Sequence, residues 1–134
     1  MLGLGDSGAH VGLIMDASLP TFFLGHWVRD RQVFTLEEGV RRLTSDTAHL
    51  FGIADRGVIR EGAYADINVF DLDALRLPLP EYVHDFPHGA GRYIQRSAGY
   101  DTTIVNGEVF MTAESGSTVA LEHTGALAGR LLRS

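Results

Sequence analysis

The sequence GVIREGAYADINVF, residues Gly57–Phe70, marks the point where the hydrophobic period of the chain changes to two. Alternation of apolar and polar residues is typical of a half-buried strand. We predict two short strands, at Val58-Ile59 and at residues 66–70, separated by a turn at Glu61-Gly62. The second half of the chain is therefore expected to be rich in β-structure.

Asp66 begins the second of these strands, and its carboxylate admits two interpretations. It stands beside the small residue Ala65, where a catalytic carboxylate is conceivable. A carboxylate at a turn more often accepts hydrogen bonds from backbone amides and thereby anchors the turn. We favour the anchoring role.

Residues 102–112, TTIVNGEVFMT, carry the clearest hairpin pattern in the chain. Asn106-Gly107 stands at its centre, and these two residue types accept the positive φ angles of a type I′ turn. β-branched residues lie before the turn. We predict two antiparallel strands with a structural role.

A helix is predicted after Thr35. Thr35 and Glu38 have the spacing of a capping box, in which each side chain binds the backbone amide of the other residue. Ser45-Asp46 is expected to divide the segment into two helices, and Gly52 is a natural end. One apolar stripe comprises Leu36, Val40, Leu43, Thr47 and Leu50, with Arg41 and Arg42 turned to solvent.

The segment Thr21–Arg29, TFFLGHWVR, places aromatic rings on one side of a predicted helix. The rings belong to Phe22, Phe23, His26 and Trp27. Such a stripe usually packs in the core. The alternative is a wall that faces substrate, with His26 lining the pocket.

Residues 72–99 hold three of the four prolines, so long regular structure is not expected there. We predict a single turn at residues 81–83 and a short strand at residues 93–96. His84 and His88 have the separation of a helical zinc pair, but Pro87 between them is incompatible with that helix. The tail, residues 124–133, is expected to dock its leucines on the core.

The N-terminal stretch Leu2–Val11, LGLGDSGAHV, is the strongest candidate for chemistry. A short apolar strand is predicted to end at Gly5, so that Asp6 projects from the sheet edge into a loop of small residues. A carboxylate in that position can act as a general base, with the nearby His10 as proton carrier or orienting group. The alternative is an aspartate that caps an ordinary loop.

Two motifs together, Gly5-Asp6-Ser7-Gly8-Ala9-His10 and Gly-x-Ile-x-x-Gly-x-x-Ala-Asp at residues 57–66, resemble one known family. The chain is similar to the C-terminal end of metal-dependent amidohydrolases, most closely their N-acyl-D-amino-acid deacylase (D-aminoacylase-like) branch. The resemblance implies an α+β chain that contains the last strand and helix of a (β/α)8 barrel and the C-terminal part of its flanking β-sandwich. Residues 1–54 would derive from the barrel and residues 55–134 from the sandwich.

The resemblance also implies an activity, the hydrolysis of linear, non-peptide amide bonds in N-acyl-D-amino acids. Asp6 would be the general base and acid at a water bound to zinc or a similar divalent metal, and a metal ligand only beside ligands absent from this chain. Ser7, His10 and His26 are the expected substrate contacts.

Departures from the family pattern limit this expectation. A complete barrel needs roughly 250 residues, and the chain has 134. The family's His-x-His metal motif does not occur among the six histidines. Asp6 alone does not supply the three protein ligands of a catalytic zinc site. We therefore expect the chain alone to bind no metal and to be inactive.

Composition bounds the remaining possibilities. The net charge is −6 without a basic cluster, which argues against nucleic acid or an anionic membrane as partner. Cysteine is absent, which excludes disulfides and thiolate ligands. No apolar run reaches the ~20 residues of a membrane span, and no secretory signal is visible. We expect a soluble, cytoplasmic protein.

Two functions from different classes remain open. The chain is either the C-terminal part of an amide hydrolase or a free-standing structural or interaction domain without catalysis. If the chain is part of such a hydrolase, apolar surface that the barrel would cover is expected to be exposed. This favours association with the missing barrel portion or with further copies of the chain.

Overall fold

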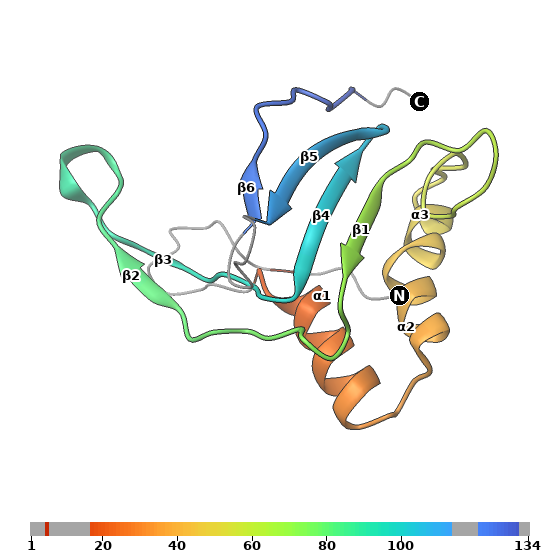
Figure 1. The fold of residues 1–134 in the computed structure, drawn as a ribbon, viewed down its shortest axis with the longest axis horizontal. Helices are drawn as coiled ribbons and strands as arrows, with labels where there is room; N and C mark the ends of the chain where they lie inside the picture. Colours follow the sequence, from red (N-terminus) through yellow and green to blue (C-terminus); the bar gives the residue numbers. More distant parts are fainter. Residues whose placement is uncertain (1–4, 6–16, 114–120, 132–134) are drawn as a thin grey trace.

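The structure, a computed structural model, describes Gly5 and residues 17–113 and 121–131. It has the α+β organisation predicted from the sequence, with a helical part, an antiparallel sheet and a projecting two-stranded hairpin (Figure 1). The helices are α1 (Leu19–Phe22), η1 (Phe23–Asp30), α2 (Leu36–Leu43), α3 (Ser45–Leu50) and the short η2 (Pro87–Gly89). The strands are β1 (Ile67–Phe70), β2 (Glu81–Val83), β3 (Arg92–Ile94), β4 (Tyr100–Val105), β5 (Glu108–Ala113) and β6 (Leu121–His123).

The main sheet has the order β1-β4-β5-β6, and every pair in it is antiparallel. The predicted hairpin is confirmed as β4 and β5. Asn106 and Gly107 have φ angles of 50° and 85°, as a type I′ turn requires. β1 pairs with β4 alone among the described strands and so forms an edge of the sheet.

The predicted strand at Val58-Ile59 is wrong. Neither residue pairs with a described strand, and their exposed fractions are 41% and 87%. An extended segment needs a neighbour to satisfy its backbone groups, and the sequence pattern does not reveal whether a neighbour is present. The predicted second strand is confirmed as β1.

The capping box is confirmed at the start of α2. The Glu38 amide donates to Thr35 Oγ1 over 3.2 Å, and Glu38 Oε2 accepts from the Thr35 amide over 3.1 Å. The predicted division into two helices is also confirmed, because Thr44 leaves the helical region between α2 and α3. Arg42 is not turned to solvent as expected, since its guanidinium lies 4.6 Å from the centre of the Phe34 ring.

The aromatic stripe is only partly core. The segment Phe23–Asp30 is wound as a π-helix, so residues five apart share a face. Phe23, Leu24 and Val28 are buried, whereas Phe22 and Trp27 stay 46% and 40% exposed.

Gly39 of α2 lets that helix approach η1 closely. A Cβ atom at this position would lie 2.6 Å from Val28 Cγ2, so a larger residue would push the two helices apart. The glycine therefore fixes how the helical part packs.

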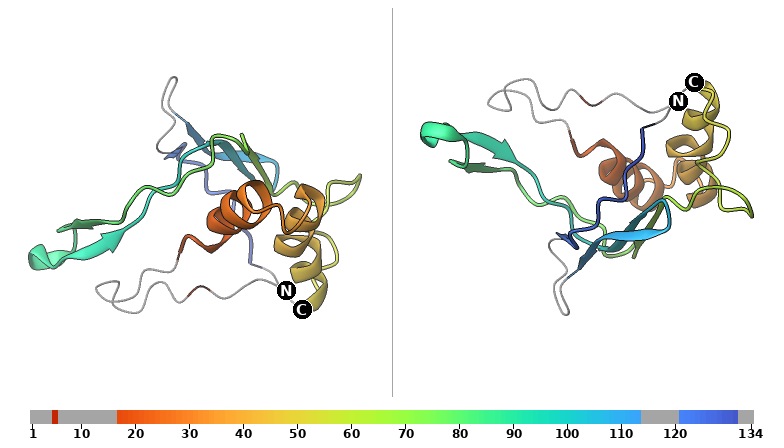
Figure 2. Two further views of the ribbon diagram at one scale, coloured as in Figure 1. Left: turned by 90° about the horizontal axis from the view of Figure 1, so that it is seen from below. Right: turned by 90° about the horizontal axis from the view of Figure 1, so that it is seen from above.

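The hairpin of β2 and β3 projects away from the rest of the molecule (Figure 2). The turn predicted at residues 81–83 is wrong, because these residues pair with β3 and the Tyr82 and Tyr93 rings meet at 4.9 Å. The strand predicted at residues 93–96 is confirmed in part, since β3 covers Arg92–Ile94. Among the described residues no helix combines the length and the apolar character that a membrane span requires.

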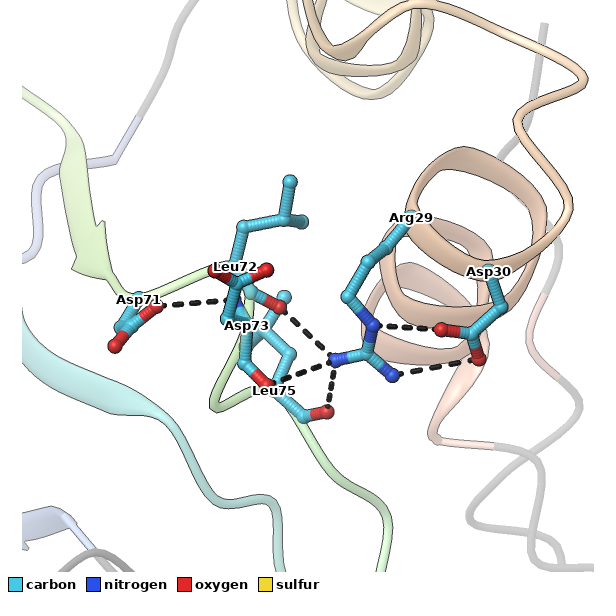
Figure 3. Close-up of polar contacts among 6 residues, drawn as sticks. All are labelled: Arg29, Asp30, Asp71, Leu72, Asp73 and Leu75. Carbon is cyan, nitrogen blue, oxygen red and sulfur yellow. Dashed lines mark hydrogen bonds and ion pairs between the residues drawn. The ribbon is translucent and has the colours of Figure 1, made fainter.

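Arg29 joins the helical part to the chain that leaves β1 (Figure 3). Its Nη1 donates to the carbonyl oxygens of Leu72 and Leu75 over 3.0 and 2.8 Å, and more weakly to that of Asp73. Its Nε donates to Asp30 over 2.7 Å, which aims the guanidinium at the loop. Leu75, only 1% exposed, packs in the core directly beside this contact.

A second polar cluster, here called the clasp, joins Arg56, Asp66, Asn106 and Ala128. Asp66 accepts from the backbone amide of Asn106 over 2.9 Å and from the Arg56 guanidinium. The Asn106 side chain accepts from Arg56 over 2.6 Å and donates to the carbonyl oxygen of Ala128. The expected docking of tail leucines is wrong for Leu127 and Leu131, which are 93% and 78% exposed, and Leu132 lies outside the described residues. Buried Ala128 together with the clasp holds the tail.

Replacing Arg29 by leucine should lower the free energy of unfolding by about 2 kcal/mol, because three carbonyl oxygens lose their donor. Arg29→Lys should lower the free energy of unfolding by less, since lysine keeps the positive charge and one donor group. Urea titration followed by circular dichroism measures both. Arg31→Leu, at an exposed position just beyond η1, is the matched control, and an equal loss in this control would contradict the role given to Arg29.

The clasp predicts an acid dependence. Partial burial by itself raises the pKa of Asp66, but the Asn106 amide and the Arg56 guanidinium outweigh burial and hold the pKa below its usual value. A lowered pKa gives stability that is present above the unfolded pKa of about 3.9 and is lost as the pH falls through the folded value. Asp66→Asn should therefore be less stable than wild type at pH 7, and the difference should shrink below about pH 4. Urea midpoints at both pH values test this, with Asp101→Asn as the control; a constant difference would contradict it.

Candidate functional site

The residues expected to carry chemistry lie at the N-terminal end of the chain. Asp6, Ser7 and His10 lie outside the described residues. Gly5, the direct neighbour of Asp6, is described, and it lines a groove of about 870 Å³. Because Gly5 directly precedes Asp6 in the chain, the groove is the part of the described surface where we look for the site of the candidate general base.

The groove lies between the helices α2 and α3 on one side and β1 on the other. Glu37 and Arg41 of α2 and Asp66 before β1 provide charged groups in its lining. Its volume is within the range of 300–1,000 Å³ that small-molecule sites occupy. Apolar side chains make up much of the wall, and they are Leu19, Pro20, Val40, Leu43, Val58, Ile59, Ile67 and Phe70.

His26 does not belong to this groove. Its imidazole stacks on the Phe22 ring at 4.9 Å and meets the Trp27 ring edge-on at 4.8 Å. The three rings form a partly exposed aromatic cluster where α1 passes into η1. The structure thus separates His26 from the groove that Gly5 lines.

Asp66 is the other carboxylate that the sequence singled out. Both of its oxygens are engaged in the clasp, one by the Asn106 amide and the other by Arg56. The turn-anchoring interpretation is confirmed, because Asn106 is the first residue of the type I′ turn. With its pKa held low, Asp66 is a poor proton acceptor at neutral pH.

The described residues do not fit a divalent metal ion. No group of three His, Cys, Asp or Glu side chains in this part of the chain is arranged to hold one. His84 Nδ1 lies 2.9 Å from the carbonyl oxygen of Gly89, and His88 occupies a left-handed position with a φ angle of 62°. The helix that a His84–His88 pair would need is absent between these residues.

Sequence reasoning missed two residues that organise the molecule around the groove, Arg29 and Arg56. Neither stands in a motif, and both bind groups more than forty residues away along the chain, at Leu72 and Asn106 respectively. A local pattern therefore carries no signal for them. The one hint is the adjacent acid, Asp30, which pairs with Arg29.

Comparisons with known proteins agree with the motifs. A model of the family described as "Amidohydrolase family" matches residues 7–111. The N-acyl-D-glutamate deacylase of Alcaligenes xylosoxydans xylosoxydans is 39% identical over 87 residues, which are 65% of this chain and 16% of that protein. The D-aminoacylase of the same organism is 36% identical over 112 residues, 81% of this chain and 19% of that protein.

A solved structure supports the same relation. A D-aminoacylase structure whose subject is its binuclear metal center matches with a TM-score of 0.62 and 34% identity, over 87% of this chain and 21% of that chain. The chain thus spans less than a quarter of the length of these relatives. The family match covers most of the chain, the identities exceed 30%, and the fold agrees: this chain belongs to the amidohydrolase family.

Proposed function

We propose that the chain provides the C-terminal part of a hydrolase that cleaves linear, non-peptide amide bonds, with N-acyl-D-amino acids as the substrate class. The observation that carries the proposal is the 36% identity with a D-aminoacylase over 112 residues. The relative called N-acyl-D-glutamate deacylase points to the same class of substrate.

Asp6 is the proposed general base and acid. Its carboxylate takes a proton from the water that attacks the amide carbon, and it returns the proton to the nitrogen of the departing amino acid. The C–N bond breaks, and the products are a carboxylic acid and a free D-amino acid. Proton transfer of this kind contributes about 10²–10⁴-fold to the rate. Ser7 and His10 are the proposed substrate contacts beside Asp6, and His26, which lies outside the groove, is proposed to contact the substrate from its place between Phe22 and Trp27.

The proposed division of the chain follows from its resemblance to the family. Residues 1–54, with the predicted strand before Asp6 and the helices α1 to α3, correspond to the end of a (β/α)8 barrel. Residues 55–134, with the sheet, correspond to the flanking β-sandwich. The groove lined by Gly5 and β1 lies where these two parts meet.

A divalent metal, such as zinc, belongs to the proposal only through the relatives, one of which is described by its binuclear metal center. Because the described residues do not fit a metal ion, we propose that Asp6 would be joined there by ligands from other polypeptide segments. The chain by itself is accordingly proposed to be inactive and to need the remaining barrel, whether covalently linked or associated.

A second candidate function is a structural or interaction domain without catalysis. It is favoured by the way the described residues stabilise one another without a metal site, through a small core, the Arg29 contacts and the clasp. In this function Asp6 has no chemical role. A test of activity therefore separates the two candidates.

A chimera tests the proposed function. In the Alcaligenes D-aminoacylase, this chain replaces the segment that it matches, so that the relative supplies the remaining residues. We expect hydrolysis of an N-acyl-D-amino acid that the intact host enzyme cleaves, with its L enantiomer as the stereochemical control. Asp6→Asn in the chimera should lower kcat/KM by at least about 10², whereas Asp101→Asn should leave kcat/KM unchanged. A folded chimera in which Asp6→Asn keeps full activity would contradict the role of Asp6.

A further inference from the structure

Asn106 and Gly107 form a pair of residues in which the asparagine side chain is readily lost as ammonia. In this reaction the backbone nitrogen of the following residue attacks the side-chain carbonyl carbon. Glycine has no side chain and leaves that approach open, and asparagine is accordingly among the thermolabile residues. Asn68, the other asparagine of the sequence, precedes the β-branched Val69, whose side chain obstructs the same attack.

In the folded chain the groups that would react are engaged in hydrogen bonds. The Gly107 amide, which would be the nucleophile, donates to the carbonyl oxygen of Ala65 over 2.9 Å. The Asn106 side-chain oxygen accepts from Arg56 over 2.6 Å, and its nitrogen, the leaving group, donates to the Ala128 carbonyl. Attack requires the side chain to turn and the Gly107 amide to give up its proton. These bonds must therefore open first.

The clasp lies close to the surface, so its opening does not require the whole chain to unfold. Gly107 is exposed and Asn106 is half-buried. Ala128, which anchors the tail, is 7% exposed, but Leu127 and Leu131 on either side of it are 93% and 78% exposed. Segments with so little buried surface open locally more readily than the core does.

We propose that Asn106 is a site of spontaneous deamidation, that the clasp gates the reaction, and that the reaction releases the tail. When the clasp opens, the Gly107 nitrogen bonds to Cγ of Asn106. The Asn106 side-chain nitrogen takes up the displaced proton and leaves as ammonia. Water then opens the resulting cyclic imide, so that residue 106 becomes aspartate or isoaspartate. The net reaction consumes one water molecule, releases one ammonia molecule, and changes the oxidation state of no atom.

Either product loses the attachment of the tail. A carboxylate at position 106 has no N–H group for the Ala128 carbonyl. It also lies near the Asp66 carboxylate, which accepts from the backbone amide of the same residue over 2.9 Å. Isoaspartate in addition lengthens the backbone within the two-residue turn and so disturbs the register of β4 with β5. Because the loss of ammonia is irreversible, it makes a transient opening of the clasp permanent.

Ageing of the whole chain at mildly alkaline pH tests the gate. Peptide mapping by mass spectrometry follows ammonia loss at each asparagine, and an isoaspartyl methyltransferase labels the isoaspartate. We expect modification at Asn106 and not at Asn68. The rate should be at least about tenfold lower in the folded chain than in the same chain unfolded in urea. An equal rate in the two states would overturn the proposal, since the clasp would then give no protection.

Two variants open the clasp from different sides. Arg56→Leu removes the donor to the Asn106 oxygen, and Ala128→Arg replaces a buried side chain by one too large for its place. Each should raise the rate of ammonia loss at least about fivefold while circular dichroism shows it folded. Arg60→Leu is the matched control, because Arg60 donates to the Ala54 carbonyl over 2.9 Å, outside the clasp. An unchanged rate in both variants would overturn the gate, as would a slower reaction in Arg56→Leu, because Arg56 would then assist the attack.

Asn106→Asp tests the release of the tail. Trypsin cleavage after Arg130 should be at least about threefold faster in this variant and in the aged chain than in the fresh chain. Asn68→Asp introduces the same charge and keeps the acceptor for Thr103 Oγ1, so it should leave the cleavage rate unaltered. An Asn106→Asp chain that trypsin cleaves no faster than wild type would overturn the release. None of these measurements involves catalysis, so their outcome is independent of the proposed hydrolase.

Discussion

The Arg29 guanidinium is the contact on which the arrangement of this chain depends. Few side chains are fully buried in the described residues, and the core cluster has only four members, Phe23, Leu24, Val28 and Leu75. Three of the four come from η1, and the fourth comes from the loop after β1. Hydrogen bonds from Arg29 to the carbonyls of that loop hold Leu75 against the helix (Figure 3). A directional polar contact thus stabilises the junction between helix and sheet that a larger apolar core would otherwise stabilise.

The groove beside β1 follows from the same organisation. The helical part contacts the sheet mainly at one end of β1 and β4, where Phe70 and Tyr100 pack against the core and Tyr100 hydrogen-bonds Thr21. Further along β1 the helices and the strand diverge, and apolar side chains line the space between them. In the family to which the chain belongs, the matched part is a minor share of the polypeptide. An exposed apolar groove is typical of a part of a protein that packs against neighbouring segments.

Local signals in the sequence were sufficient wherever a few neighbouring residues determine the structure. Thr35 with Glu38 specified the start of α2, and Asn106-Gly107 specified the turn between β4 and β5. Asp66 was correctly interpreted as an anchor. The failures have different causes. Val58 and Ile59 pair with no described strand, Arg42 packs on Phe34 from the loop before α2, and the π-helical winding of η1 changes which aromatic rings are buried. Of the candidate site, the described residues include His26 alone, and the role of Asp6 rests on the family motif.

Asn106 illustrates how one residue can be chosen by two unrelated demands. Its backbone must adopt the positive φ angle of the turn, which glycine and aspartate also tolerate. Its side chain must accept a hydrogen bond from Arg56 and donate another to the Ala128 carbonyl. Glycine can make neither bond. An ionised aspartate can accept from Arg56 but cannot donate to Ala128. A single substitution at position 106 can therefore remove the attachment of the tail without changing the geometry of the hairpin. A glycine at this position would retain the bend and release the last segment of the chain.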